Sequence, residues 1–127
     1  MSVKSFTIGA VQYNAAMASA VDQDRLLSLL TAPLIERAYA AAREGKELDN
    51  DILMPMFMGM AQQTKAQVVE ILMGKVVING KEQLVTVADF GGKLVQYNQL
   101  LAELLKWNLS DFFDWLPSVR SDEKAAQ

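Results

Sequence analysis

The dipeptide Asn79-Gly80 constrains the fold of this chain more than any other feature of the sequence. It separates two short runs that favour strands, Val76–Ile78 and 81–85. Asparagine and glycine both accept the positive φ that a type I′ turn requires at its two central positions, and this turn matches the twist of paired strands. The sequence therefore predicts a β-hairpin over 76–85. Because a lone hairpin is only marginally stable, we expect it to pair with another strand or to pack on a helix.

Another strand is expected near the N-terminus. Residues 4–11 alternate, with Phe6, Ile8 and Ala10 on one face and smaller residues on the other. A period of two is typical of a strand with one buried face. The small residues that follow are expected to form a connection to the first helix.

The first of three amphipathic stretches predicts a helix with a cap at Asp22 or Asp24 and an end at Gly45. Its apolar residues recur at the spacing of one helix face, so this face is expected to be buried. Pro33 lies inside the stretch and is expected to kink or divide the helix. The apolar face comprises Leu26, Leu27, Leu30, Leu34, Ala38, Ala41 and Ala42.

A second helix is expected between the charged linker 44–51 and Met73. One of Asp49, Asn50 and Asp51 is available as its cap. Pro55 is tolerated only near the first turn of a helix, so the start is expected between Asn50 and Met54.

The C-terminal part predicts two more helices. The third amphipathic stretch begins between Thr86 and Gly92 and ends near Asn108. A short helix over 111–116 is then expected, with Ser110 as its cap and Pro117 as its stop.

The domain organisation follows from these elements. Residues 118–127 are polar and without periodicity, so we expect a flexible tail there and a single globular domain over 1–117. The predicted fold class is α+β and mainly α, with three to four helices, the hairpin over 76–85 and an N-terminal strand.

Two residue types are absent, and this narrows the chemistry. The chain has no histidine and no cysteine, which excludes a thiol nucleophile, an imidazole base, a disulfide and the usual zinc and iron–sulfur ligand sets. Its 12 basic and 15 acidic residues give a net charge of −3, which offers no electrostatic reason to bind nucleic acid or an anionic membrane. We therefore expect a protein that is not an enzyme and holds no metal or cofactor.

Three acidic pairs are candidates for catalytic carboxylates or metal ligands. Each lies at a predicted helix start, where unpaired N–H groups and the helix dipole favour acids, and we interpret all three as caps. An enzyme that works through carboxylates stays an alternative, and it requires two acids distant in sequence to meet in one pocket. The pairs are Asp22 with Asp24, Asp49 with Asp51, and Asp111 with Asp114.

The expected location is the cytoplasm. The apolar stretch that follows Lys4 is interrupted at Gln12 and is shorter than a signal peptide needs. The longest apolar run, 52–61, has about half of the ~20 residues of a membrane span and contains Pro55 and Gly59.

Two apolar segments are candidates for binding a partner protein, and the first is rich in methionine. Its methionines fall on two flanks of the second predicted helix, and one helix face cannot bury both flanks equally. Methionine is flexible and polarizable, so an exposed methionine surface adapts to several partners or to one extended partner. The alternative is that these residues fill the core or an oligomer interface. The candidates are Met54, Met56, Phe57, Met58 and Met60.

The second segment is aromatic and lies directly before the polar tail. Tryptophan is enriched at interface hot spots, which favours a binding role. The alternative is a short terminal helix that folds back and buries its rings against the core. The candidates are Trp107, Phe112, Phe113 and Trp115.

These elements, in this order, resemble the tail assembly chaperones of long-tailed bacteriophages of the lambdoid type. The resemblance lies in the segment from Phe6 to Ala10, the helix start from Gln23 to Leu30, and Asp111-Phe112-Phe113 before a polar end, and it spans most of the chain. It implies a non-enzymatic protein of the infected bacterial cytoplasm. Such a protein coats the tape measure protein during tail assembly and helps to recruit tail tube subunits.

A coating role has a physical rationale. A long helical tape measure protein exposes apolar surface that would aggregate, and copies of a small domain with an adaptable apolar face can cover it. A chaperone of this kind is expected to self-associate. The alternative function is a small helical regulator or inhibitor that binds one protein partner and need not self-associate.

Overall fold

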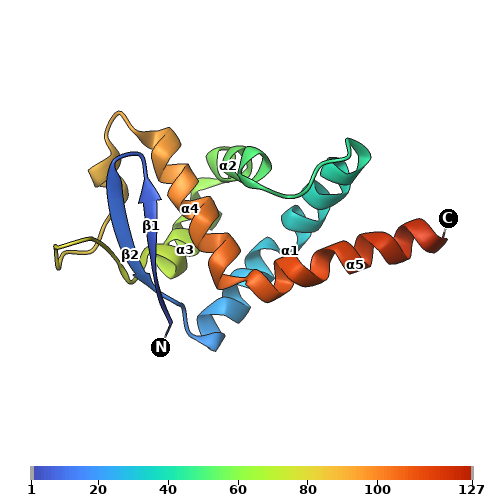
Figure 1. Cartoon of the computed structure of the whole chain (residues 1–127), viewed down its shortest axis with the longest axis horizontal. Coiled ribbons are helices and arrows are strands. Elements are labelled where there is room, and N and C mark those ends of the chain that lie inside the picture. The colour runs from blue at the N-terminus through green and yellow to red at the C-terminus, as the bar shows by residue number, and fades with distance from the viewer. Residues whose placement is uncertain (1, 127) are drawn as a thin grey trace.

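A three-stranded antiparallel sheet lies at one end of a group of five α-helices (Figure 1). The computed structural model describes the backbone of residues 2–126 and the side chains of residues 2–118. The fold is α+β and mainly helical, as predicted, but it has more helices and a larger sheet than the sequence indicated.

The N-terminal strand is one arm of a hairpin that the sequence analysis missed. Strand β1 (Val3–Ile8) turns through Gly9 and pairs antiparallel with β2 (Val11–Ala16), with Phe6 opposite Tyr13. The prediction of a connection after Val11 was therefore wrong. Tyr13 and Ala15 face the core at a period of two, but alanine alone gives little indication of a strand.

The predicted hairpin over 76–85 is present only in part. Its first arm is β3 (Val76–Ile78), which pairs with β2, whereas its second arm meets β3 at a single bridge between Val77 and Leu84. The turn closes with a 2.9 Å hydrogen bond from Lys81 N–H to the Ile78 carbonyl.

The turn of this hairpin is not of type I′. Gly80 has a φ of +84°, but Asn79 does not have a positive φ, which is the pattern of a type II turn. The N–H of Asn79 donates to the Gln12 carbonyl at 2.9 Å and so continues the β2–β3 ladder. This bond keeps Asn79 in line with the strand and leaves only Gly80 to adopt the left-handed conformation.

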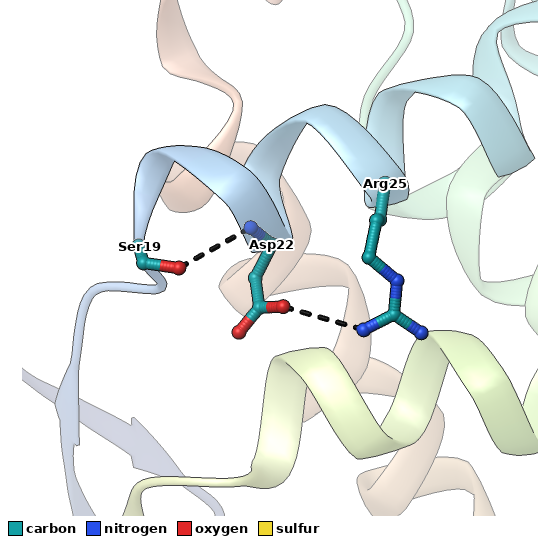
Figure 2. A network of polar contacts seen from close by, with 3 residues as sticks. All are labelled: Ser19, Asp22 and Arg25. Atoms are coloured by element: carbon teal, nitrogen blue, oxygen red, sulfur yellow. Dashed lines mark hydrogen bonds and ion pairs between the residues drawn. The ribbon is translucent and has the colours of Figure 1, made fainter.

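Helix α1 (Ala20–Arg43) begins three residues earlier than the predicted caps allow. Ser19 is the cap, and its hydroxyl accepts a hydrogen bond from Asp22 N–H at 3.2 Å (Figure 2). Asp22 lies in the first turn and forms a 3.3 Å ion pair with Arg25. The acid therefore supports the helix start through the dipole and this pair, not as the cap itself.

The rest of α1 follows the prediction closely. The helix ends just before Gly45, and the predicted apolar face is buried at Leu26, Leu30, Leu34, Ala38 and Ala41. Pro33 does not divide the helix, which continues for ten residues beyond it.

The predicted second helix is two helices. Helix α2 (Asn50–Met58) has Asp49 as its cap, which accepts from Asp51 N–H at 3.0 Å, and helix α3 (Gln62–Met73) follows a break at 59–61. Gly59 occupies the C-cap of α2. Glycine is about 1 kcal/mol less favourable than alanine inside a helix, and here it ends one.

The two C-terminal helices differ from the prediction at the start of the first helix and at the end of the second. A 3₁₀ turn, η1 (Val87–Phe90), is closed by a capping box and precedes α4 (Leu94–Asn108), which starts later than expected and ends where expected. Helix α5 (Ser110–Ala126) continues through Pro117, so the predicted end at 116 was wrong. A proline inside a helix removes one backbone hydrogen bond, and α5 tolerates that loss. The flexible tail over 118–127 stays a prediction, because side chains from 119 onward lie outside the described part.

Helix α4 is the central element of the core. It contacts β1, η1, α2, α3 and α5, and it crosses in front of α3 in Figure 1. Its buried face includes Leu100, Leu101, Leu104 and Leu105. Near its start, Tyr97 lies 5.2 Å from Phe90 between ring centroids, and Phe90 lies 5.9 Å from Tyr13 on the sheet. This row of rings joins the sheet to α4.

Two adjacent glycines before α4 allow a matched test of backbone strain. Gly92 has a φ of +74° and Gly91 a φ of −52°, and neither has an atom within 4 Å of where a Cβ would lie. We expect Gly92→Ala to lower the free energy of unfolding by about 1 kcal/mol, because an L-residue is strained at positive φ. Gly91→Ala is the control and should be neutral or slightly stabilising. Equal losses in urea denaturation would contradict this assignment of strain.

Candidate protein-binding surface

Most of the predicted methionine surface belongs to the core. Met56 and Phe57 are buried, so the structure removes both from the candidate binding residues. Met54 and Met60 are half-buried and pack against the same core. Only Met58 presents a large exposed area. Helix α2 ends at Met58, and it packs against α4. Its buried residues are Leu53, Met56 and Phe57.

Most of the aromatic segment folds back against the core, which was the alternative to a binding role. Phe112 is buried and is removed from the candidates, because the start of α5 packs against α1 and the end of α4. Trp107 is half-buried, with its ring edge-on to Phe6 at 5.6 Å. Phe113 is half-buried, and Trp115 is 51% exposed while it contacts the Phe112 ring at 5.7 Å. Trp115 is thus the aromatic residue of this segment with the most free surface.

A groove at the start of α3 and α4 is lined largely by apolar side chains, several of them exposed. It measures about 450 Å³ and lies between the end of α2, α3, η1 and the first turn of α4. Four of its side chains are large, apolar and exposed, at 46% for Met58, 51% for Val87, 56% for Leu94 and 61% for Val95. Contiguous exposed apolar area of this kind is typical of a protein-binding surface. The other lining residues are Gln62, Lys65, Val69, Tyr97 and Asn98.

A single lysine lies in this groove. The Lys65 ammonium donates to Asn98 Oδ1 at 2.9 Å and lies 5.6 Å from the centroid of the Tyr97 ring. Burial disfavours the charged form and lowers the pKa of Lys65 below its ordinary value. None of the ion pairs formed within residues 2–118 includes Lys65. Its positive charge is therefore held by a neutral amide and a ring face, without a carboxylate.

Two helix starts add to the positive potential of the groove. Helices α3 and α4 both begin there, and neither has a side chain that caps its first N–H groups. The exposed N–H groups of a helix start carry a partial positive charge. The chain has a net charge of −3, whereas Lys65 and the two helix starts give this groove a positive potential.

A second hollow, of about 360 Å³, lies between the linker after α1 and the α4–α5 corner. Its apolar lining residues are Leu48, Phe113, Leu116 and Pro117. Its lysine, Lys106, is already paired with Glu103 at 3.5 Å, and Glu47 and Asp114 lie around it. With charges of both signs and little exposed apolar surface, this hollow is the weaker candidate.

Each acidic pair has at least one member at a helix start, but Asp24 and Asp114 lie beyond the first turns of α1 and α5. Asp49 caps α2, Asp22 is in the first turn of α1, and Asp111 is in the first turn of α5, where its carboxylate accepts from Phe112 N–H at 2.8 Å. Among the described residues, no three acidic side chains gather closely enough to hold a metal ion. None of the helices described is long and apolar enough to cross a membrane.

The groove residues that were not predicted from the sequence as binding residues include Lys65, Val87, Leu94 and Val95. One signal was available for Lys65, since no acid stands three or four residues from it on its helix. Leu94 and Val95 are neighbours in sequence, so one helix face cannot bury both. That the segments around residues 58, 65, 87 and 94 meet in one groove follows only from the tertiary packing.

We compared the chain with protein-family models, with curated proteins and with solved structures, and nothing in these comparisons matches it. The resemblance to tail assembly chaperones therefore rests on the sequence segments that carry it.

Proposed function

We propose that this chain is a non-enzymatic tail assembly chaperone of a long-tailed bacteriophage. In this proposal it acts without a cofactor in the cytoplasm of the infected cell, where it binds the tape measure protein and helps to recruit tail tube subunits. The segments that carry the resemblance lie in β1 and the turn after it, in the first turns of α1 and at the start of α5.

The observation that carries the proposal is the exposed apolar groove. The core is already well filled with large, fully buried side chains, so Met58, Val87, Leu94 and Val95 are not needed to close it. Apolar surface left in water is unfavourable and becomes favourable when a partner covers it. A chaperone uses such a surface to shield the apolar face of an elongated client until assembly encloses it.

Self-association is part of the proposal. Coating a long client requires many copies, and the exposed ring of Trp115 on α5 is available for contacts between copies. The groove and Trp115 lie on different elements, so a copy can contact the client and a neighbour through separate surfaces.

Co-expression with the tape measure protein tests the function. The variant Leu94→Ser/Val95→Ser removes apolar surface from the groove at two exposed positions, so the fold should be retained. We expect the wild-type chain to keep the tape measure protein soluble and to co-purify with it, and this variant to lose most of both effects.

The matched control is Val3→Ser/Val21→Ser, which removes a similar apolar area at two exposed positions away from the groove. It should behave as the wild type does. Equal co-purification of both variants would remove the groove from the proposal. A tape measure protein that stays soluble without this chain would remove the chaperone function itself.

The mass of the chain in solution distinguishes the alternative function. A monomer that forms a one-to-one complex with a single partner would indicate a regulator or inhibitor. Self-association that Trp115→Ala weakens would support the coating function.

A further inference from the structure

We propose that the α3–α4 groove binds one amphipathic helix of a partner protein, and that an acidic side chain of this helix pairs with Lys65. This inference rests on the proposed function, because it states which kind of client segment the chaperone would take. The proposed occupant is a helical segment that carries one carboxylate beside its row of apolar side chains.

The lining of the groove suits the apolar face of a helix. Its exposed side chains come from α2, η1 and α4, and α3 adds Gln62, Lys65 and Val69 to the lining. A helix that lays its apolar face into a groove of this kind does so through residues at i, i+3, i+4 and i+7. The four exposed side chains, Met58, Val87, Leu94 and Val95, give such a row several contacts.

Lys65 favours a partner helix that carries a carboxylate. Once a partner covers the groove, water no longer solvates the ammonium, and a buried charge without an opposite charge is costly. Asn98 already uses its amide group to donate to the Leu94 carbonyl at 2.8 Å, so its Oδ1 atom is the single acceptor it offers to Lys65. A carboxylate on the partner would satisfy the remaining N–H groups of Lys65, and the uncapped starts of α3 and α4 favour the same charge.

A second copy of this chain does not offer a matching face. Among residues 2–118, the other large exposed apolar side chains are Val3, Val21, Leu84 and Trp115, and they lie on four different segments. Trp115 does have Asp111 and Asp114 beside it on α5, but its neighbours Phe112 and Leu116 are buried in their own core. One ring cannot fill a groove with four aliphatic side chains, so the occupant is a helix of another protein.

Designed peptides provide the test. The probe is a helical peptide of about 18 residues, long enough to form a helix in water, with a row of leucines at helical spacing. One version carries a single glutamate on one flank of the row, a second carries it on the other flank, and a third has glutamine at both positions. Binding to the full chain is measured by calorimetry and by fluorescence anisotropy.

The variants separate charge from packing. Lys65→Met keeps most of the aliphatic stem and removes the charge, and Lys81→Met removes the same charge on the exposed turn after β3. We expect one glutamate peptide to bind the wild type about five- to tenfold more tightly than the glutamine peptide, the range for a charged hydrogen bond that is partly buried. Lys65→Met should abolish this preference, and Lys81→Met should keep it. Circular dichroism and thermal unfolding establish that both variants fold.

Four results would decide the matter. A preference for the glutamate peptide that depends on Lys65 supports the inference. The variant Leu94→Ser/Val95→Ser should weaken the binding of all three peptides. Equal binding of the glutamate and glutamine peptides, or no binding, would overturn it. Self-association that Leu94→Ser/Val95→Ser abolishes would overturn it in favour of a second copy. The proposed function is judged separately, since co-purification of the tape measure protein can persist when the peptides fail and can fail when they bind.

Discussion

Phe57→Ala should lower the free energy of unfolding by about 3–5 kcal/mol, the cost of removing a large buried ring and leaving a cavity. Phe57 is fully buried in the core, on the helix that packs against α4. A domain of this size has a total stability of about 5–15 kcal/mol, so a large part of the margin would be lost. Urea denaturation followed by circular dichroism measures the change, with the tryptophans as a second probe.

The neighbouring residue is the matched control. Met58 follows Phe57 directly but is 46% exposed, so Met58→Ala should change the free energy of unfolding by less than about 0.5 kcal/mol. The two substitutions remove large apolar side chains from the same helical turn, one of them buried and the other exposed. If Met58→Ala were as destabilising as Phe57→Ala, the division of this segment between core and groove would be wrong.

Asn108→Ala is expected to lower the free energy of unfolding by about 2 kcal/mol, because it leaves a backbone N–H without its partner. Asn108 is buried at the end of α4, and its Oδ1 atom accepts from Ala18 N–H at 2.8 Å. Its amide group donates to the Leu104 carbonyl at 2.9 Å. The side chain thus joins the segment after β2 to the last turn of α4. Chemical denaturation and amide hydrogen exchange at Ala18 measure the loss.

Asn98 supplies the control for this prediction. It is the other buried asparagine of α4 and makes the same bond to the carbonyl four residues earlier, at 2.8 Å. Its Oδ1 atom accepts from the Lys65 ammonium, and that ammonium can turn to water when the amide is removed. Asn98→Ala should therefore cost less than Asn108→Ala. The reverse order would show that the link between α4 and the segment after β2 does not hold the fold together.

The sequence predicted the elements whose side chains repeat with a clear period. The leucines and alanines of α1 recur at helical spacing from Leu26 to Ala41, and that stripe is buried as expected. Strand β2 escaped prediction because its inward residues include Ala15, whose small side chain gives little contrast with its neighbours. The break between α2 and α3 escaped as well, because a single Gly59 inside a helical pattern is often tolerated.

The residues of the candidate site could be predicted from the sequence only where the local segment alone determines whether a side chain is exposed. Met58 and Trp115 were named from the sequence, and both are exposed. Met56, Phe57 and Phe112 were named for the same reason but face the core, because the direction in which α2 and α5 pack is a tertiary property. Lys65 was missed because its importance comes from what surrounds it, which includes residues more than twenty positions away.

The order of the strands has a consequence for how the chain is made. Strand β3 joins β2 far along the sequence, and Asn14 and Asn79, which bond to each other across this pair, are 65 residues apart. During synthesis β1 and β2 can form their hairpin at once, but the other edge of β2 has no partner until three helices have left the ribosome. An unpaired strand edge readily pairs with other chains. A protein proposed to protect others from aggregation thus passes through an interval in which its own nascent sheet is unprotected.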